Sequence, residues 1–416
     1  MTISWKQKSN PNLITEQIQN SKIVGDNNTV QFEAFNFNVF KILLYNILDF
    51  PPDISEIDAR QMIYQGIMNS ANKREITPKN ILTELNLLEQ KFLSLPFQRY
   101  VLITSISISR FIKINKIYLH NDIIIFENNL SEPYINDKTK ELLKRASSWL
   151  FSDLPKDYSN VRIHVSSRSI YNAANQALEN VDFIRGIWNW VLNRSTTYRK
   201  TYGGMQSPIN RIILGPIHTL HRINGDFITP NEWWYEPSYL GAIKTYNPTQ
   251  DDMNKLYQSQ FIIRKKINKL QYLNDIKSAF IRYAKALDER DLTSSYIKLW
   301  GILEFLTNTN NGPSHDITVK RASSIYKERE FHFQVLRILK NYRNSYVHSA
   351  EETSEIETYL FRLKNYVDSL FTFHINNTFH FESIEKAAEF LDLPVDKKEF
   401  KFKLKLYNFA KSFRHY

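Results

Sequence analysis

The spacing of apolar residues changes near residue 250, and this change limits what the chain can fold into. Upstream, short β-branched runs alternate with stretches of helical periodicity, whereas from about residue 255 apolar residues recur at helical spacing throughout. The polar segment NPTQDDMN, residues 247–254, separates the two patterns. We therefore predict an α+β N-terminal domain over residues 1–250, followed by an all-α helical bundle over residues 251–416.

Helices and strands are both expected in the N-terminal half. Thr77 is a suitable N-cap, Pro78 fits the first helical position, and Ile81 and Leu85 begin an apolar helix face. The predicted helices cover residues 77–96 and 169–193, and the predicted strands cover residues 100–111, 121–127 and 161–167. Farther on, the cluster Trp233, Trp234 and Tyr235 is expected to form a buried aromatic plug, with a base-stacking platform as the alternative.

The bulk composition describes an ordinary globular protein with a basic balance. The net charge is +11, which favours a polyanionic partner such as nucleic acid, although a lysine-rich solvated surface would give the same number. Cysteine is absent, which excludes disulfides, thiolate metal sites and a cysteine nucleophile. No secretory leader and no membrane-spanning run stands out, so we expect a cytoplasmic protein without a membrane partner.

The densest basic tract lies at the C-terminus, DKKEFKFKLKLYNFAKSFRHY, residues 396–416, where lysines interleave with aromatic and aliphatic residues. This tract could grip phosphates, or it could form a last amphipathic helix whose aromatic side chains pack on the core. The apolar spacing favours the packed helix.

Common cofactor motifs are missing. The only close histidine pair, His218 and His221 in HTLH, has no carboxylate companion, and YGGMQS, residues 202–207, lacks the Lys-Ser/Thr ending of a phosphate-binding loop. We therefore expect neither a metal nor an organic cofactor.

The segment NYRNSYVHSAEE, residues 341–352, places Arg343, Asn344 and His348 near the end of a helix. Asn344 and His348 are i and i+4 neighbours, while Arg343 lies about 140° from His348 around the axis, a gap that a long guanidinium arm can partly close. A basic chain produces such pairs by chance: Arg211 and His218 form another, in NRIILGPIHTL, where residues 212–214 and the Gly-Pro break predict a strand and a turn. His348 could also act simply as a helix cap.

The chemistry that these residues support is RNA cleavage without a metal. A histidine near neutral pKa can move protons at the 2′-hydroxyl or the leaving 5′-oxygen, and an arginine can hold the charge that develops on the phosphate.

Three segments in the same order, LWGILEFLT (299–307), HDITVKRASSIY (315–326) and RNSYVH (343–348), make residues 265–410 resemble the Apea-like branch of the HEPN domains. The resemblance implies a HEPN helical bundle that dimerises, with the possibility of higher oligomers. Two Arg-x4–6-His motifs would then face each other and form a composite, metal-independent endoribonuclease that leaves 2′,3′-cyclic phosphate ends.

Position by position, the resemblance makes Arg343 and His348 the catalytic pair and Asn344 the polar residue after the arginine. Glu304 takes the acidic position of an earlier helix, or is a surface or capping carboxylate. The candidate RNA-binding residues are Lys320, Arg321 and Tyr346, with the alternative that Arg321 pairs with an acid inside the bundle.

Residues 1–250 resemble, more loosely, the regions that precede such domains in bacterial proteins, which implies a sensor or regulatory role and an unidentified phage or cellular trigger. The implied biology is anti-phage defence by abortive infection, or a toxin, with cellular RNA, transfer RNA included, as the substrate. Two alternatives remain open at this point: a non-catalytic HEPN scaffold for dimerisation or binding, and a basic nucleic-acid-binding regulator. The second has no recognisable binding module.

Overall fold

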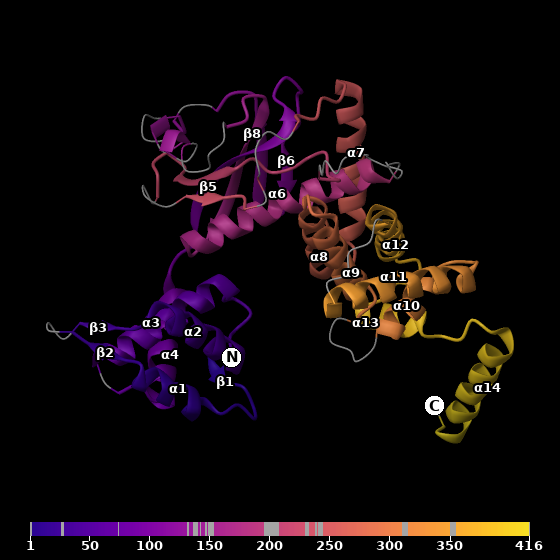
Figure 1. Cartoon of the computed structure of the whole chain (residues 1–416), viewed down its shortest axis with the longest axis horizontal. Helices are drawn as coiled ribbons and strands as arrows, with labels where there is room; N and C mark the ends of the chain where they lie inside the picture. The colour runs from indigo at the N-terminus through magenta and orange to yellow at the C-terminus, as the bar shows by residue number, and fades with distance from the viewer. Residues whose placement is uncertain are drawn as a thin grey trace.

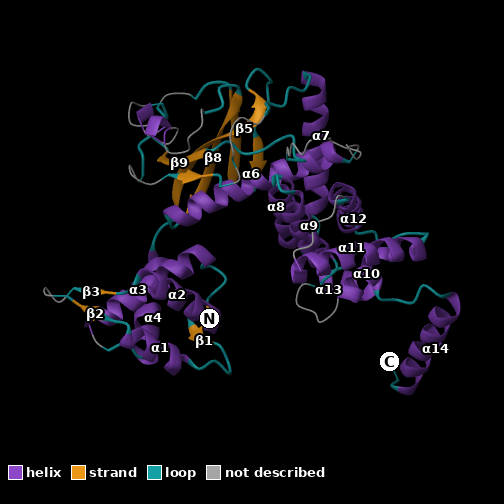
Figure 2. Cartoon of the chain, viewed as in Figure 1, coloured by secondary structure: helices purple, strands orange, loops and turns teal. Residues whose placement is uncertain are grey.

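The computed structural model describes residues 2–25, 29–73, 75–130, 133–135, 140–141, 143–145, 148, 154–194, 208–228, 233–237, 239, 244–309, 315–349 and 355–415; of residues 315, 348 and 349 it describes the backbone. Figure 1 shows the order of the elements in space, and Figure 2 shows that the long strands gather in one sheet, whereas the two ends of the chain are mainly helical.

The first elements of the chain, β1 to α4, are mainly helical and have a hydrophobic core of their own. Its buried side chains include Ile18, Leu44, Ile63, Ile67 and Leu85. The helices are α1 (Pro11–Asn20), α2 (Ala34–Ile47), α3 (Glu56–Lys73) and α4 (Pro78–Ser94), and the short strand pairs are β1 (Ser4–Trp5) with β4 (Leu48–Asp49) and β2 (Ile23–Val24) with β3 (Val30–Gln31). The helix predicted over residues 77–96 is confirmed as α4, with the Thr77 side chain accepting from the Asn80 N–H.

A six-stranded antiparallel sheet follows, in the order β10-β9-β5-β8-β7-β6. The strands are β5 (Gln98–Ser109), β6 (Ile117–Leu119), β7 (Asp122–Glu127), β8 (Tyr158–Ser167), β9 (Ile217–Arg222) and β10 (Trp234–Tyr235). The three predicted strands are confirmed as β5, β7 and β8. In the register, Tyr100 of β5 lies between Val165 of β8 and Arg222 of β9, which places β5 inside the sheet.

The strand predicted over residues 212–214 was wrong. Residues 212–214 make only an isolated bridge, between Leu214 and Ile106, and the strand begins after the Gly-Pro break, as β9. The reason is that Ser107 of β5 divides its backbone hydrogen bonds between Ile213 and Tyr246, so a continuous ladder with 212–214 does not form.

The aromatic cluster at 233–235 is not a buried plug. Trp233 and Trp234 are half-buried and Tyr235 is 46% exposed. Because β10 pairs with β9 at the sheet edge, its side chains have a neighbouring strand on one side only.

Helix α6 (Ile170–Asn193) joins the sheet to the helical region. The helix predicted over residues 169–193 is confirmed, and its Ala174, Ala177, Val181, Ile184 and Trp188 are all buried. The helix packs on β8 and β5 and also on α7 and α8 (Figure 2). The contact with α8 depends on Gly186, because a Cβ there would lie 2.5 Å from the backbone oxygen of Phe280.

The C-terminal region is all-helical, as predicted. Its helices are α7 (Gln250–Ile267), α8 (Leu273–Leu287), α9 (Leu292–Leu306), α10 (His315–Ser323), α11 (Arg329–Ser349), α12 (Ile356–Asn376), α13 (Ile384–Leu391) and α14 (Lys397–Phe413). One hydrophobic cluster runs from Tyr100 in the sheet through Phe280 in α8 to Ile384 in α13, so the sheet and the helices α7–α13 share a core.

The last helix departs from this arrangement. The prediction that residues 396–416 pack their aromatic side chains on the core was wrong: α14 is a helix, but none of its residues is buried, and it stands apart from the other helices in Figure 1. Its apolar residues alternate with lysines, which puts Phe400 and Leu404 on one side of the helix and Phe402 and Leu406 on the other. A helix with apolar residues on opposite sides has no single face to bury.

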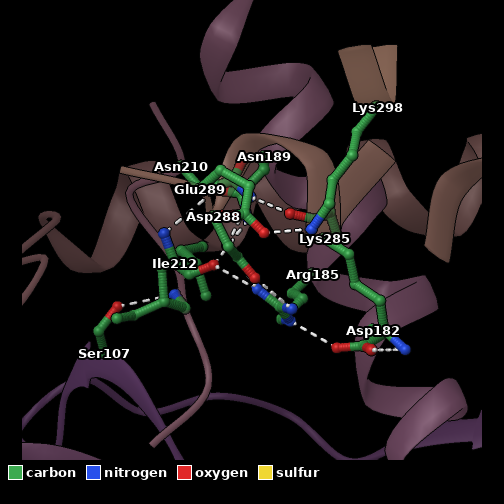
Figure 3. Close-up of polar contacts among 12 residues, drawn as sticks. Ser107, Asp182, Arg185, Asn189, Asn210, Ile212, Lys285, Asp288, Glu289 and Lys298 are labelled. Atoms are coloured by element: carbon green, nitrogen blue, oxygen red, sulfur yellow. Dashed lines mark hydrogen bonds and ion pairs between the residues drawn. The ribbon is translucent and has the colours of Figure 1, made fainter. Parts of the chain in front are cut away.

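A buried polar network connects the sheet, α6 and α8 (Figure 3). The guanidinium of Arg185 is bound at Nε by Asp182 (2.7 Å) and at Nη1 and Nη2 by the two carboxylate oxygens of Asp288 (2.9 and 2.6 Å). Asn210 donates to the same Asp288 (2.7 Å), and Asn189 donates to the Ile212 carbonyl (2.7 Å). Burial acts to lower the pKa of Arg185, but the two carboxylates raise it above its ordinary value, so the arginine stays charged inside the protein.

Candidate active site

The predicted catalytic motif lies in the last two turns of α11. Leu336, Leu339 and Tyr342 are buried and attach this helix to the rest of the bundle. The Tyr296 hydroxyl of α9 donates to the Leu339 carbonyl at 2.7 Å. The position of the α11 end is therefore fixed by its packing.

Tyrosine rings surround this point of attachment. The Tyr342 ring lies 5.1 Å from that of Tyr296 and 5.3 Å from that of Tyr359, which lies in the first turn of α12. Tyr346, one turn farther, lies 6.5 Å from Tyr342 and is half-buried. These contacts hold the helix end against both α9 and α12.

Arg343 and Asn344 are half-buried on this braced helix end. Arg343 Nη1 donates to Asn344 Oδ1 at 3.3 Å, which is long for a hydrogen bond of this type. Among the described residues Arg343 makes no ion pair. Its charge is felt by Tyr296: burial raises the pKa of Tyr296 well above its ordinary value, and Arg343 opposes that rise.

His348 lies in α11 one turn after Asn344, and its side chain is outside the described residues. The backbone places the two residues on the same side of the helix, as the sequence spacing predicts.

Glu304 is held elsewhere on α9. Its Oε1 accepts from the Trp300 indole at 2.7 Å, and it lies two turns, roughly 12 Å of helix, beyond Tyr296, the residue of α9 that meets α11 near the motif. No hydrogen bond between Glu304 and Arg343 occurs in the described part of the chain.

Arg321 pairs with an acid inside the bundle, which is the alternative that the sequence left open. Its guanidinium contacts both carboxylate oxygens of Asp392, at 3.0 and 2.7 Å, and donates to the carbonyls of Thr307 and Asn308. These bonds join α10 to the end of α9 and to α13. Lys320, the neighbouring candidate for RNA binding, is exposed.

The other Arg–His pair has a different environment. His218 is fully buried in β9, where Nδ1 lies 2.6 Å from the Thr104 hydroxyl, and burial lowers its pKa to about 4. Arg211 is exposed at the surface. His221 contacts Thr219 and the Gly225 carbonyl, so both histidines of HTLH are part of the sheet.

Two features are absent from the described residues. No group of three or more His, Asp or Glu side chains there could hold a metal ion, and no helix there is long and apolar enough to cross a membrane.

The sequence reasoning overlooked the buried network of Asp182, Arg185 and Asp288. A signal was present, because Asp182 and Arg185 lie three residues apart within an otherwise apolar stretch of helix. Asp288 could not have been connected to them, since it follows the end of α8, more than a hundred residues farther along the chain.

No protein-family model, curated protein or solved structure matches the chain. The resemblance to HEPN domains therefore remains a prediction from the sequence, and the function must be argued from the geometry of the site.

Proposed function

We propose that this protein is a metal-independent endoribonuclease that acts through Arg343, Asn344 and His348 at the end of α11. The observation that carries the proposal is the state of Arg343. It is half-buried on a well-braced helix end, and among the described residues it has one long hydrogen bond and no ion pair. An arginine in this state is available for a phosphate.

The proposed reaction needs only a proton carrier and a fixed cation. The 2′-hydroxyl oxygen attacks the adjacent phosphorus and loses its proton, the bond to the 5′-oxygen breaks, and that oxygen gains a proton. The products are a 2′,3′-cyclic phosphate and a 5′-hydroxyl. His348 moves protons in this scheme, and Arg343 stabilises the charge on the non-bridging oxygens.

A second copy of the chain would complete the site in this proposal. Two apolar side chains exposed on the same side of α11, Phe331 and Ile338, support such a contact, because a partner helix would cover them. The same residues also support the second candidate function, a non-catalytic dimerisation scaffold. The defence role and the cellular RNA target rest on the resemblance alone.

Cleavage of total cellular RNA in EDTA, with mapping of the product ends, tests the proposal. We expect wild-type protein and the Arg337→Ala control, an exposed change on the same helix, to leave cyclic phosphate ends, and His348→Ala to lose about 10²–10⁴-fold in rate. Cleavage at the wild-type rate by His348→Ala would remove His348 from the mechanism. Absence of cleavage by every protein, with and without cell extract as a source of trigger, would favour the scaffold.

A further inference from the structure

A cavity of about 870 Å³ lies between the β6–β7 turn, α6 and the link from α7 to α8. It is within the size range of small-molecule binding sites. Its walls come from both the sheet and the C-terminal helices, and none of its lining residues belongs to the proposed catalytic motif.

One wall of the cavity is an ordered chain of hydrogen bonds. Asp122, which is 6% exposed, accepts at Oδ2 from the amides of Gln176 and Asn180, both at 2.7 Å. Asn180 in turn accepts at Oδ1 from Lys277 Nζ at 3.1 Å. The chain therefore runs from the sheet through α6 to α8 and fixes the direction of each group.

The cavity also contains two cations that make no direct ion pair with a carboxylate in the described structure. Lys277 and Arg264 are half-buried, and neither makes an ion pair within the described residues. Arg264 donates to the Gln260 side chain and to the Tyr118 carbonyl, and Lys277 to Asn180, so their described partners are all uncharged. Burial lowers the pKa of both side chains. At Lys277 the carboxylates of Glu179 and Asp122, which form no ion pair with it, oppose that shift.

The other well-buried cations of this protein differ in that respect. Arg185 lies against Asp182 and Asp288, Lys364 lies 2.7 Å from Asp368, and Arg321 lies against Asp392. Since the partial burial of two cations without a direct carboxylate partner is unfavourable, an anionic ligand that contacts both would stabilise them.

The remaining lining groups indicate what the anion is attached to. Carboxamide side chains, among them Asn121, Asn268 and Asn274, offer both donors and acceptors, and Phe183 provides an aromatic surface. Groups of this kind suit a flat, polar ring, because they can bond its edges and contact its face.

We propose that this cavity binds a nucleotide, with its phosphate on Lys277 and Arg264 and its base among the carboxamides. The ligand would contact the sheet region and the C-terminal helices together. The assignment does not depend on the proposed nuclease activity, because binding is measured directly.

Thermal unfolding and titration calorimetry of the full-length protein with ATP, GTP, ribose 5-phosphate and inorganic phosphate test the assignment. A nucleotide should raise the unfolding temperature of the wild type in a saturable manner, and the sugar phosphate and free phosphate should bind at least tenfold more weakly. Lys277→Gln should weaken nucleotide binding at least tenfold. Lys277→Arg, which keeps the charge, and Lys265→Gln, which removes an exposed charge from the neighbouring α7, should retain it.

Three results would overturn the assignment: no saturable binding of either nucleotide at millimolar concentration, equal binding by Lys277→Gln and Lys265→Gln, or inorganic phosphate binding as tightly as the nucleotides. If Lys277→Gln unfolds at a lower temperature, Arg264→Gln provides an independent test, because the proposal requires both cations.

Discussion

Two arginines of this molecule occupy opposite situations. Arg185 is 1% exposed, and two carboxylates bind its guanidinium on α6, whereas Arg343 is half-buried near the end of α11 and has a single long bond to an amide in the described structure. The first has its hydrogen-bonding capacity committed to the fold, and the second has capacity to spare. Residue type alone therefore does not identify a functional arginine; its partners do.

The difference should appear first in stability. Arg185→Ala leaves Asp288 buried without a counter-charge and leaves Asp182 with only the exposed Lys285, 3.6 Å away, so we expect the free energy of unfolding to fall by about 3–5 kcal/mol. Urea unfolding followed by circular dichroism measures the change. Arg343→Ala should lower the free energy of unfolding by less than about 1 kcal/mol. Equal losses in the two variants would remove the contrast on which the account depends.

The order of the two effects reverses when RNA cleavage is measured instead of stability. If Arg343 stabilises charge on the phosphate, Arg343→Ala should lower the RNA cleavage rate by about 10²–10³-fold, and Arg343→Lys should recover only part of the loss because an ammonium group cannot bind two phosphate oxygens side by side. Rates on a defined RNA, taken from folded preparations, measure this. Full activity of Arg343→Lys would reduce the role of Arg343 to that of a point charge.

Two buried histidines should make the free energy of unfolding depend on pH. Burial lowers the pKa of His218 and of His374 to about 4, so the unfolded chain takes up protons near pH 6.5 before the folded protein does. The stabilisation by the neutral side chains is present above pH 6.5 and is lost as the pH falls toward 4, by about 3 kcal/mol for each histidine.

Urea unfolding midpoints between pH 7.5 and 4.5 test this expectation. The His374→Gln variant, which lacks one of the two groups, should show a shallower dependence on pH. An unchanged slope would mean that His374 does not titrate as a buried neutral group.

The smallest effect is expected in α14. None of its residues is buried, so Phe402→Ser should change the free energy of unfolding by less than about 0.5 kcal/mol, whereas Phe371→Ser, in the shared core, should cost several kcal/mol. Urea unfolding at several protein concentrations measures both. A large loss for Phe402→Ser would mean that α14 packs against another surface in solution.

Local signals were sufficient for much of the fold. The Thr77 cap followed by Pro78 located α4, and alternating β-branched residues located β5, β7 and β8. These signals work because each depends on neighbouring residues of the same element. The fold class, an α+β region followed by helices, could be predicted for the same reason.

Features that depend on contacts between residues far apart in the sequence could not be predicted from the sequence alone. Residues 212–214 do not form the predicted strand because Ser107 shares its backbone hydrogen bonds between Ile213 and Tyr246. The sheet and the C-terminal helices share a core because α6 packs on both. For the candidate site, the sequence predicted that Arg343 and Asn344 lie near the end of a helix, which α11 confirms, while their catalytic role stays a prediction. It could not tell that Arg321 binds Asp392, because their contact joins residues 71 positions apart.

The most direct test of the account is to measure RNA cleavage in EDTA and the unfolding midpoint on the same preparations of wild type, Arg343→Ala and the surface control Arg337→Ala. The account predicts that Arg343→Ala loses at least about a hundredfold in cleavage rate while its midpoint stays close to that of the control. An Arg343→Ala protein that cleaves RNA as fast as the control would contradict the assignment of Arg343 to the active site.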